Sequence, residues 1–300
     1  MSWLVCHIVS GDAFISGLLF VAAGLALIWL RRTKGGQLAG RVLLIVGWIL
    51  TIAGPDPRYT FEVVAALCLS AWSFAASLKV NLRRRADSKP DGTASTRYSS
   101  MIGISLVFAL LMLEAPGYPQ PALFNGWWSG EPIHVIGDSL SAGIGAGEGE
   151  PWPSRLAAIL GSEVVSHAQA GATAKSAIEQ AEQLSADSFV IVEIGGNDLL
   201  GGRSAAEFEQ DLDQLLTKVC SDGRRVVMFE LPLPPFYLRF GEAQHKLARN
   251  HGVTLIPRRV LARVLFSEAA TLDSIHLSET GHRRLAEEVA ARLKEGAAPK

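Results

Sequence analysis

A serine, an aspartate and a histidine in the second half of the chain have the types and spacing of a hydrolytic triad. Ser139 stands in the run Gly-Asp-Ser-Leu at 137–140, at the end of a short apolar segment. A serine hydroxyl is a weak nucleophile unless an adjacent base takes its proton. Asp273 and His276 lie three residues apart in an expected loop, so the carboxylate can hold imidazole Nδ1 and leave Nε2 free. The pattern predicts Ser139 as nucleophile, His276 as general base and Asp273 as the residue that orients the ring.

Candidate donors for an oxyanion follow other apolar segments of the same half. Asn197 lies in Gly-Gly-Asn-Asp at 195–198, after the most apolar segment, and its side-chain amide can donate. Gly171 offers a backbone N–H with no side chain in the way, and Ser139 supplies its own N–H. Each donor of this kind is worth about 10²–10³ in rate. We therefore expect an oxyanion hole formed by Ser139, Gly171 and Asn197.

The elements that must position these residues alternate between strand and helix. Strands are expected at 133–137, 163–166, 189–194, 225–231 and 253–256, and helices at 152–160, 173–184, 204–220, 242–250 and 278–293. This alternation predicts a parallel sheet with helices on both faces. In such a sheet, ligands bind beyond the carboxyl ends of the strands, where the serine, the glycine and the amide stand.

Residues 131–294 resemble the GDSL/SGNH hydrolases, most of all their bacterial thioesterase I, lysophospholipase L1 and arylesterase branch. Four stretches carry the resemblance: HVIGDSLSAG at 134–143, AGAT at 170–173, VEIGGNDLL at 192–200 and DSIHLSETGH at 273–282. The resemblance implies a three-layer α/β/α flavodoxin-like domain that hydrolyses carboxylic esters or thioesters without a cofactor or metal. It gives the nucleophile, oxyanion and Asp-His roles to Ser139, Gly171, Asn197, Asp273 and His276. The chain departs from the family pattern at Ala170, where Asn is usual, and at Leu277, where Pro is frequent.

The segment after the fourth expected strand is rich in proline and apolar residues. Leu231, Pro232, Pro234 and Phe236 are expected to line an acyl site, although a plain rigid loop would have the same composition. Lysophospholipids or other acyl lipids are the expected substrates, because the first part of the chain predicts a nearby bilayer.

Three other functions remain open from the sequence. An O-acyltransferase or deacetylase acting on a cell-surface glycan would use the same triad. A metallophosphoesterase would use oxygen and nitrogen ligands, but it leaves Ser139 without a role. Its ligands would be Asp138, Asn197, Asp198, Asp273 and His276. A membrane-bound binding protein with an inactive site is the third. A net charge of −1 over 300 residues argues against a nucleic-acid-binding protein.

Residues 1–116 predict a membrane anchor, followed by a linker at 117–130 and the hydrolase domain at 131–295. Apolar stretches at 14–30, 38–54, 61–80 and 99–115 approach the roughly 20 residues that cross a bilayer core. The second and fourth are short and could instead be re-entrant or buried helices. Lys and Arg gather between the first and second stretches and between the third and fourth, which marks these loops as cytoplasmic. Both termini and the hydrolase domain are thus expected outside, as in a bacterial inner-membrane protein.

Overall fold

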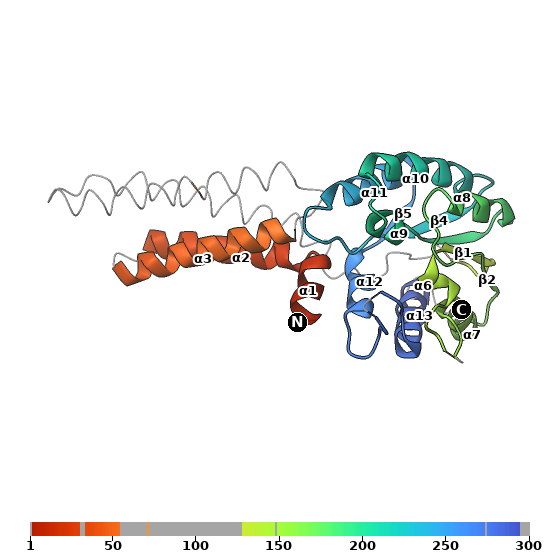
Figure 1. Ribbon diagram of the computed structural model, residues 1–300, viewed down its shortest axis with the longest axis horizontal. Helices are drawn as coiled ribbons and strands as arrows, with labels where there is room; N and C mark the ends of the chain where they lie inside the picture. The colour runs from red at the N-terminus through yellow and green to blue at the C-terminus, as the bar shows by residue number, and fades with distance from the viewer. Residues whose placement is uncertain are drawn as a thin grey trace. The chain divides into compact units, whose positions relative to one another are not determined.

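The computed structural model describes residues 2–30, 34–54, 71, 128–147, 149–273 and 275–294. The chain divides into two compact units (Figure 1), one spanning 11–120 and the other combining 1–10 with 121–300. Apart from residue 71, the apolar stretches at 61–80 and 99–115 lie outside the described residues, as does most of the linker expected at 117–130.

The larger unit is built on a five-stranded parallel sheet with the strand order β2-β1-β3-β4-β5. The strands are β1 Ile133–Gly137, β2 Val164–Ser166, β3 Phe189–Glu193, β4 Arg225–Phe229 and β5 Thr254–Ile256. β1 and β3 are buried along their whole length, as expected for a parallel sheet covered on both faces. The order is that of a flavodoxin-like doubly wound sheet. The predicted α/β fold with a parallel sheet is therefore confirmed.

Helices cover both faces of this sheet. In Figure 1, α8, α10 and α11 lie above it, and α7, α12 and α13 lie below it. Their bounds are α7 Trp152–Leu160, α8 Ala177–Gln180, α10 Ala205–Val219, α11 Leu238–His251, α12 Arg258–Leu265 and α13 Glu279–Lys294. The larger unit has two hydrophobic cores, and alternate residues of β3 pack into each. Val190 and Val192 lie in one core, and Phe189 and Ile191 lie in the other.

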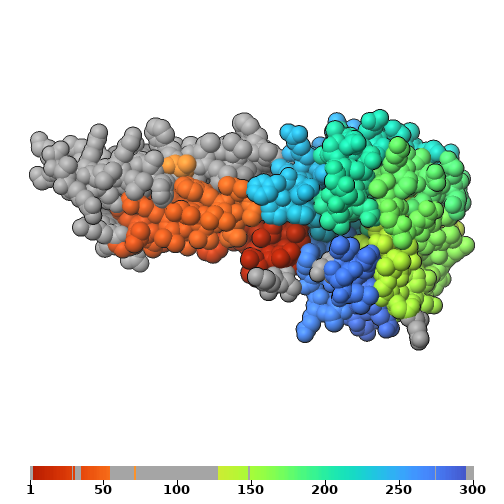
Figure 2. Space-filling view, viewed as in Figure 1, coloured from red at the N-terminus to blue at the C-terminus, as the bar shows by residue number. Residues whose placement is uncertain are grey.

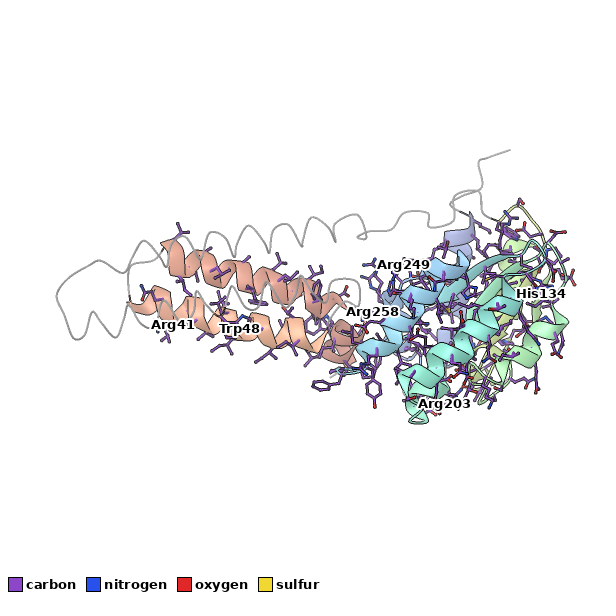
Figure 3. All side chains as sticks on the ribbon, turned by 90° about the horizontal axis from the view of Figure 1, so that it is seen from above. Arg41, Trp48, His134, Arg203, Arg249 and Arg258 are labelled. Carbon is purple, nitrogen blue, oxygen red and sulfur yellow. The ribbon has the colours of Figure 1, made fainter. Side chains whose placement is uncertain are left out.

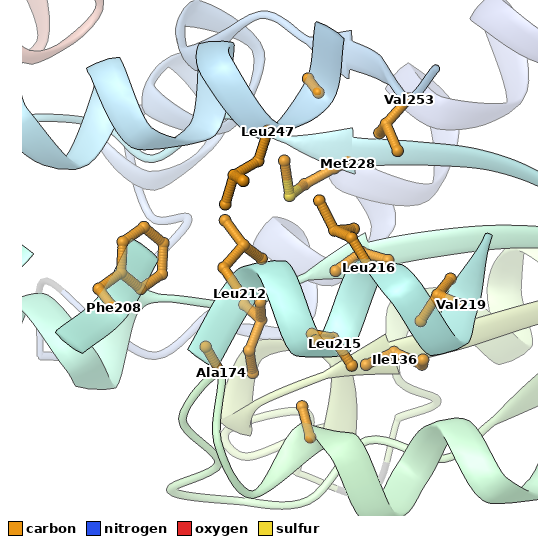
Figure 4. Packing of buried hydrophobic residues seen from close by; sticks show 14 of the residues in the cluster. Ile136, Ala174, Phe208, Leu212, Leu215, Leu216, Val219, Met228, Leu247 and Val253 are labelled. Carbon is orange, nitrogen blue, oxygen red and sulfur yellow. The ribbon is translucent and has the colours of Figure 1, made fainter. Parts of the chain in front are cut away.

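Helix α10 shows how local sequence sets these elements. Ser204 caps it, because its side chain accepts the Glu207 N–H while the Glu207 side chain returns to the Ser204 backbone. Five apolar residues at helical spacing form its buried face (Figure 4): Phe208, Leu212, Leu215, Leu216 and Val219. Cap and periodicity together explain why the predicted helix at 204–220 matches the observed one within one residue at each end.

Two expectations about helices need correction. The helix expected at 173–184 is reduced to α8 and a 3₁₀ turn at Ala181–Gln183. Its first residues belong to a loop instead, because the Ala174 N–H goes to Asp198 Oδ2 at 2.9 Å and the Thr173 N–H goes to Ser176 Oγ at 2.9 Å. Helix α12, which was not expected, is a short amphipathic helix that follows Pro257 and buries its apolar side against the sheet.

Two buried glutamines bind the backbone at strand ends. The Gln180 side chain accepts the N–H of Gly137 and donates to its carbonyl, both at 3.0 Å. Gln244 does the same beyond β4, accepting the Leu231 N–H at 2.9 Å and donating to the Phe229 carbonyl at 3.0 Å. Each amide thus satisfies two backbone groups where the strand ladder ends. The end of β1 is therefore held by helix α8 as well as by its neighbouring strands.

The substitution Gln180→Ala is expected to destabilise the larger unit. It leaves the buried Gly137 N–H without its partner, which costs about 1–3 kcal/mol, while the Gly137 carbonyl keeps the hydrogen bond from the Gln169 N–H at 3.1 Å. A clear fall in Tm of the full chain in detergent, followed by intrinsic fluorescence, is the expected result. Gln214→Ala, on the exposed side of α10, is the matched control and should stay within about 0.5 kcal/mol of the parent. Equal stability of both variants would contradict the role given to Gln180.

The smaller unit contains a closely packed pair of helices, α2 Asp12–Leu30 and α3 Lys34–Ala53. Glycines face each other across the pair: a Cβ at Gly24 would lie 2.7 Å from the Gly40 carbonyl oxygen, and one at Gly47 would lie 2.8 Å from that of Gly17. Only glycine permits such an approach of two backbones. Large apolar side chains of the pair are exposed instead, among them Leu19, Leu38, Ile49 and Ile52. Figure 3 shows side chains that project outward along both helices.

Among the described residues, one helix is long and apolar enough to cross a membrane, Gly35–Ala53 within α3. A second candidate membrane span exists only if the helices Trp3–Val9 and Asp12–Ile28 are counted together as one broken span. α2 and α3 coincide with the stretches expected at 14–30 and 38–54. Four spans are not shown by the part of the chain that the structure describes.

Candidate functional site

Ser139 lies at the turn between β1 and the short helix α6 Ser139–Ala142. Asp138 caps this helix, since its Oδ1 accepts the Leu140 N–H at 3.0 Å. Gly137 is required at the turn, because a Cβ there would lie 2.6 Å from the Ser141 side chain and 3.1 Å from the Glu193 carbonyl oxygen. The turn places Ser139 beyond the carboxyl end of β1, 8% exposed and facing a cavity.

Asp273 and His276 form the hydrogen-bonded pair that their spacing predicts. Asp273 Oδ2 lies 2.8 Å from His276 Nδ1, while Oδ1 accepts the backbone N–H groups of Ile275 at 3.1 Å and His276 at 2.8 Å. The bonds from the His276 backbone and ring and from the Ile275 N–H lower the pKa of Asp273 to about 2. The carboxylate is therefore ionised at neutral pH and fixes the ring through Nδ1.

Two buried carboxyl groups lie beside the serine. Glu193 ends β3 opposite Gly137, is 3% exposed, and accepts the Ser141 Oγ–H at 2.8 Å. Burial raises the pKa of Glu193 well above its ordinary value. Burial also raises the pKa of Asp138 to about 6, against the opposing effects of the Leu140 N–H, a hydrogen bond with Glu193 and the charge of His276. Two adjacent carboxyls that both resist ionisation hold a proton between them near neutral pH.

The structure brings the segment that carries His276 to the cavity at Ser139. His276 is close enough to Asp138 for its charge to lower the pKa of that carboxyl, and Ile275 lines the same cavity as Ser139. Among the hydrogen bonds of the described residues, none joins Ser139 Oγ to the His276 ring. Such bonds are frequently long without substrate and tighten in the complex.

Gly171 and Asn197 lie in the segments that follow β2 and β3, the two strands that flank β1 in the sheet. Asn197, in helix α9 Gly196–Leu200, donates through Nδ2 to the Ala172 carbonyl at 2.9 Å and to Asp138 Oδ2 at 3.2 Å. Gly171 has φ +78°, a left-handed conformation that favours glycine. The Asn197 amide thus bridges the loop that carries Gly171 and the carboxyl group of Asp138, the residue before Ser139.

Asp198 has a structural environment. It is fully buried, accepts the Ala174 N–H at 2.9 Å and faces Arg203 Nε at 3.5 Å from Oδ1. Burial raises its pKa, opposed by the Ala174 N–H and by the charge of Arg203. Its carboxyl therefore anchors the loop that carries Gly171. Among the described residues, no group of three or more His, Cys, Asp or Glu side chains could hold a metal ion.

A largely apolar cavity of about 360 Å³ opens at Ser139. Of the residues expected to form an acyl site, Leu231, Pro232 and Pro234 line it. Phe236 is 91% exposed at φ +74° and is not among the residues that line the cavity. The remaining wall includes Leu200 and, from the N-terminus of the chain, residues of helix α1 Ser2–Val9.

Sequence reasoning missed several residues that shape this site. Gln180, Ser141 and Trp152 belong to no sequence motif that assigns them a role. Trp152 Nε1 nevertheless donates to Ser141 Oγ at 3.2 Å, and Ser141 Oγ in turn donates to Glu193. Glu193 did carry a signal, since it is the single charged residue in an otherwise apolar expected strand. A charge at such a position is retained only where a partner or a function compensates for its burial.

Asp138 is expected to make the stability of the larger unit depend on pH. Its pKa of about 6 in the folded chain exceeds the roughly 3.9 of an unfolded aspartate, and two pH units correspond to about 3 kcal/mol. A raised folded pKa gives stability that is present below about pH 4 and is lost as the pH rises through about 6. The fall in Tm between pH 4 and pH 7 should therefore be smaller for Asp138→Asn than for the parent. Asp187→Asn, on the surface, should follow the parent, and an Asp138→Asn curve parallel to the parent would contradict the assignment.

Comparisons with known proteins show what the chain is similar to. The model of the GDSL-like Lipase/Acylhydrolase family matches residues 135–284. The chain is 28% identical over 180 residues to Esterase TesA of Pseudomonas aeruginosa, covering 55% of this chain and 88% of the relative. It is 28% identical over 174 residues to thioesterase 1/protease 1/lysophospholipase L1 of Escherichia coli, covering 55% and 84%. A crystal structure of TesA matches with a TM-score of 0.48 and 27% identity, covering 55% of this chain and 98% of that one.

Proposed function

Because the chain belongs to the GDSL-like lipase/acylhydrolase family and is an ester hydrolase of that family, we propose that it cleaves acyl esters or thioesters through a Ser139-His276-Asp273 triad. The observation that carries the proposal is the cavity at Ser139. It joins the serine and Asn197 to an apolar wall, and Ile275, which lies between the hydrogen-bonded Asp273 and His276 in the sequence, lines it as well. A hydroxyl beside an apolar cavity suits an acyl group whose carbonyl meets the serine.

In the proposed mechanism, Ser139 Oγ attacks the acyl carbonyl while His276 Nε2 takes its proton. Asp273 holds Nδ1 and stabilises the imidazolium. The Ser139 and Gly171 N–H groups and the Asn197 amide donate to the oxyanion. For this the Asn197 amide exchanges its bond to Asp138 Oδ2, 3.2 Å long, for one to the oxyanion. The alcohol or thiol leaves with the proton from His276, and water then releases the acid by the reverse sequence.

The substrate class rests on the cavity and on the relatives. Apolar residues dominate the wall, which favours an acyl chain over a charged or sugar-like group. The relatives are named as an esterase and as a thioesterase and lysophospholipase. We infer that this chain acts on acyl esters or thioesters that carry an aliphatic chain, lysophospholipids among them.

Ser139→Ala and His276→Ala are expected to lower kcat for a short p-nitrophenyl ester by at least about 10⁴-fold, because each removes a member of a unit that acts together. The assay uses the full chain in detergent, with kcat and KM measured separately. Ser221→Ala, just after α10, and His251→Ala, at the end of α11, replace the same residue types at positions that do not line the cavity and should retain parent activity. Substantial hydrolysis by either site variant would refute the triad.

We also propose that the N-terminal residues anchor the enzyme in a membrane with the hydrolase unit on the extracytoplasmic side. The outward side chains of α2 and α3 support this, since Leu38 is 62% exposed, Ile49 61% and Leu19 54%. Such surfaces are costly in water and favourable in lipid. The basic residues at 31–41 support the orientation, because Lys and Arg mark the cytoplasmic loops.

This topology predicts opposite outcomes for two reporter fusions in a bacterial host. Alkaline phosphatase joined after residue 300 should be active, whereas joined after residue 35 it should be inactive. Green fluorescent protein at the same two positions should give the reverse pattern. The full chain should also resist extraction from membranes by alkaline carbonate. Release by carbonate would refute the anchor, and reversed reporters would refute the orientation.

A further inference from the structure

Helix α1 forms part of the wall of the cavity that opens at Ser139. Val5, Ile8 and Val9 form this part of the wall. Ile8 and Val9 follow Val5 by three and four residues, so the three side chains lie on the same side of α1. Val9 is 6% exposed, so it is covered as thoroughly as a core residue. These residues lie outside 135–284, the segment that matches the family model.

Contacts with the hydrolase fold hold α1 in this place. α1 packs against α12, and the Cys6 thiol approaches the Ala262 carbonyl at 3.8 Å. Leu261 and Leu265 of the same helix α12 line the cavity beside α1. In Figure 2 the first residues, in red, lie against the blue part of the larger unit. A segment about 130 residues before Ser139 in the sequence therefore shares a cavity with it.

The position of this wall decides what it can contact. The polar residues of the cavity, Ser139 and Asn197 among them, stand where the carbonyl of an ester would react. Val5, Ile8 and Val9, the α1 residues that line the cavity, are aliphatic and carry no group for acid-base chemistry. They can therefore contact only the apolar part of a substrate, which is the acyl chain once its carbonyl is at Ser139.

We propose that Val5, Ile8 and Val9 determine which acyl chain length the enzyme accepts. This inference rests on the proposed esterase function. Each methylene that moves from water into an apolar site raises kcat/KM about fourfold, equivalent to about 0.8 kcal/mol. The gain continues until the chain reaches the wall, so side-chain volume on α1 sets the length at which it stops.

The test measures kcat/KM of the full chain in detergent for p-nitrophenyl esters from acetyl to palmitoyl. Ile8→Trp should lower kcat/KM at least tenfold for the longest esters that the parent accepts, while acetyl ester hydrolysis stays within about twofold. Ile8→Ala should shift the optimum to longer chains. Leu4→Trp places the same indole on the exposed side of α1, where Leu4 is 48% exposed and does not line the cavity. This control should keep the parent profile.

The outcomes separate this inference from the function on which it rests. A parent chain that hydrolyses none of the esters would refute the esterase function itself. A parent that is active, with Ile8→Trp and Ile8→Ala profiles identical to its own, would refute the role of α1 alone. A uniform loss for all esters in Ile8→Trp would also contradict it, since that points to general damage. Val5→Trp, at a residue that is 42% exposed, repeats the test should Ile8→Trp fail to fold.

Discussion

The hydrogen-bond ladder between β1 and β3 sets Gly137 opposite Glu193. Because the two strands are parallel, their carboxyl ends lie side by side, and the turns that follow them must share one small space. One turn carries Asp138 and Ser139, and the other carries Asn197, whose amide donates to Asp138 Oδ2. A shift of this register by one residue would reverse the faces of β3 and separate the serine from the amide. The geometry of the candidate site therefore depends on this pairing more than on any single motif residue.

The same pairing brings the carboxyl groups of Asp138 and Glu193 together in a buried place. Burial disfavours their charge, which raises both pKa values. Hydrogen bonds compensate in part, from the Leu140 N–H to one carboxyl and from the Ser141 hydroxyl to the other. In the proposed mechanism, an anion beside Ser139 would oppose the negative charge that develops on the substrate. Keeping these groups partly protonated near neutral pH reduces that repulsion.

Local signals in the sequence were sufficient for most of the sheet and for the longer helices. β1 and α7 have the bounds that their apolar runs predict, and α10 has both a capping box and an apolar face. The Asp273–His276 hydrogen bond also follows from spacing, since three residues in a loop suffice to form it. The placement of Leu231, Pro232 and Pro234 at the cavity follows from their position after β4.

Features that depend on distant contacts were not predictable in the same way. Helix α1 lines the cavity because it packs on α12, some 250 residues later, and nothing in its own sequence indicates that partner. The start of α8 is delayed because Asp198, on another loop, binds the Ala174 N–H. Phe236 is apolar and suitably placed in the sequence, yet a positive φ directs the chain so that it is exposed.

Gln180 and Gln244 bind the ends of β1 and β4 from helices α8 and α11, which cover one face of the sheet (Figure 1). The strand ends are thus fixed by helices on that face as well as by the strand ladder. Loops at this edge can lengthen, shorten or be exchanged while the backbone from which they start stays in place. Such an arrangement separates the part of the molecule that must stay constant from the part that can diversify, which suits a scaffold whose selectivity is to be altered by grafting new loops.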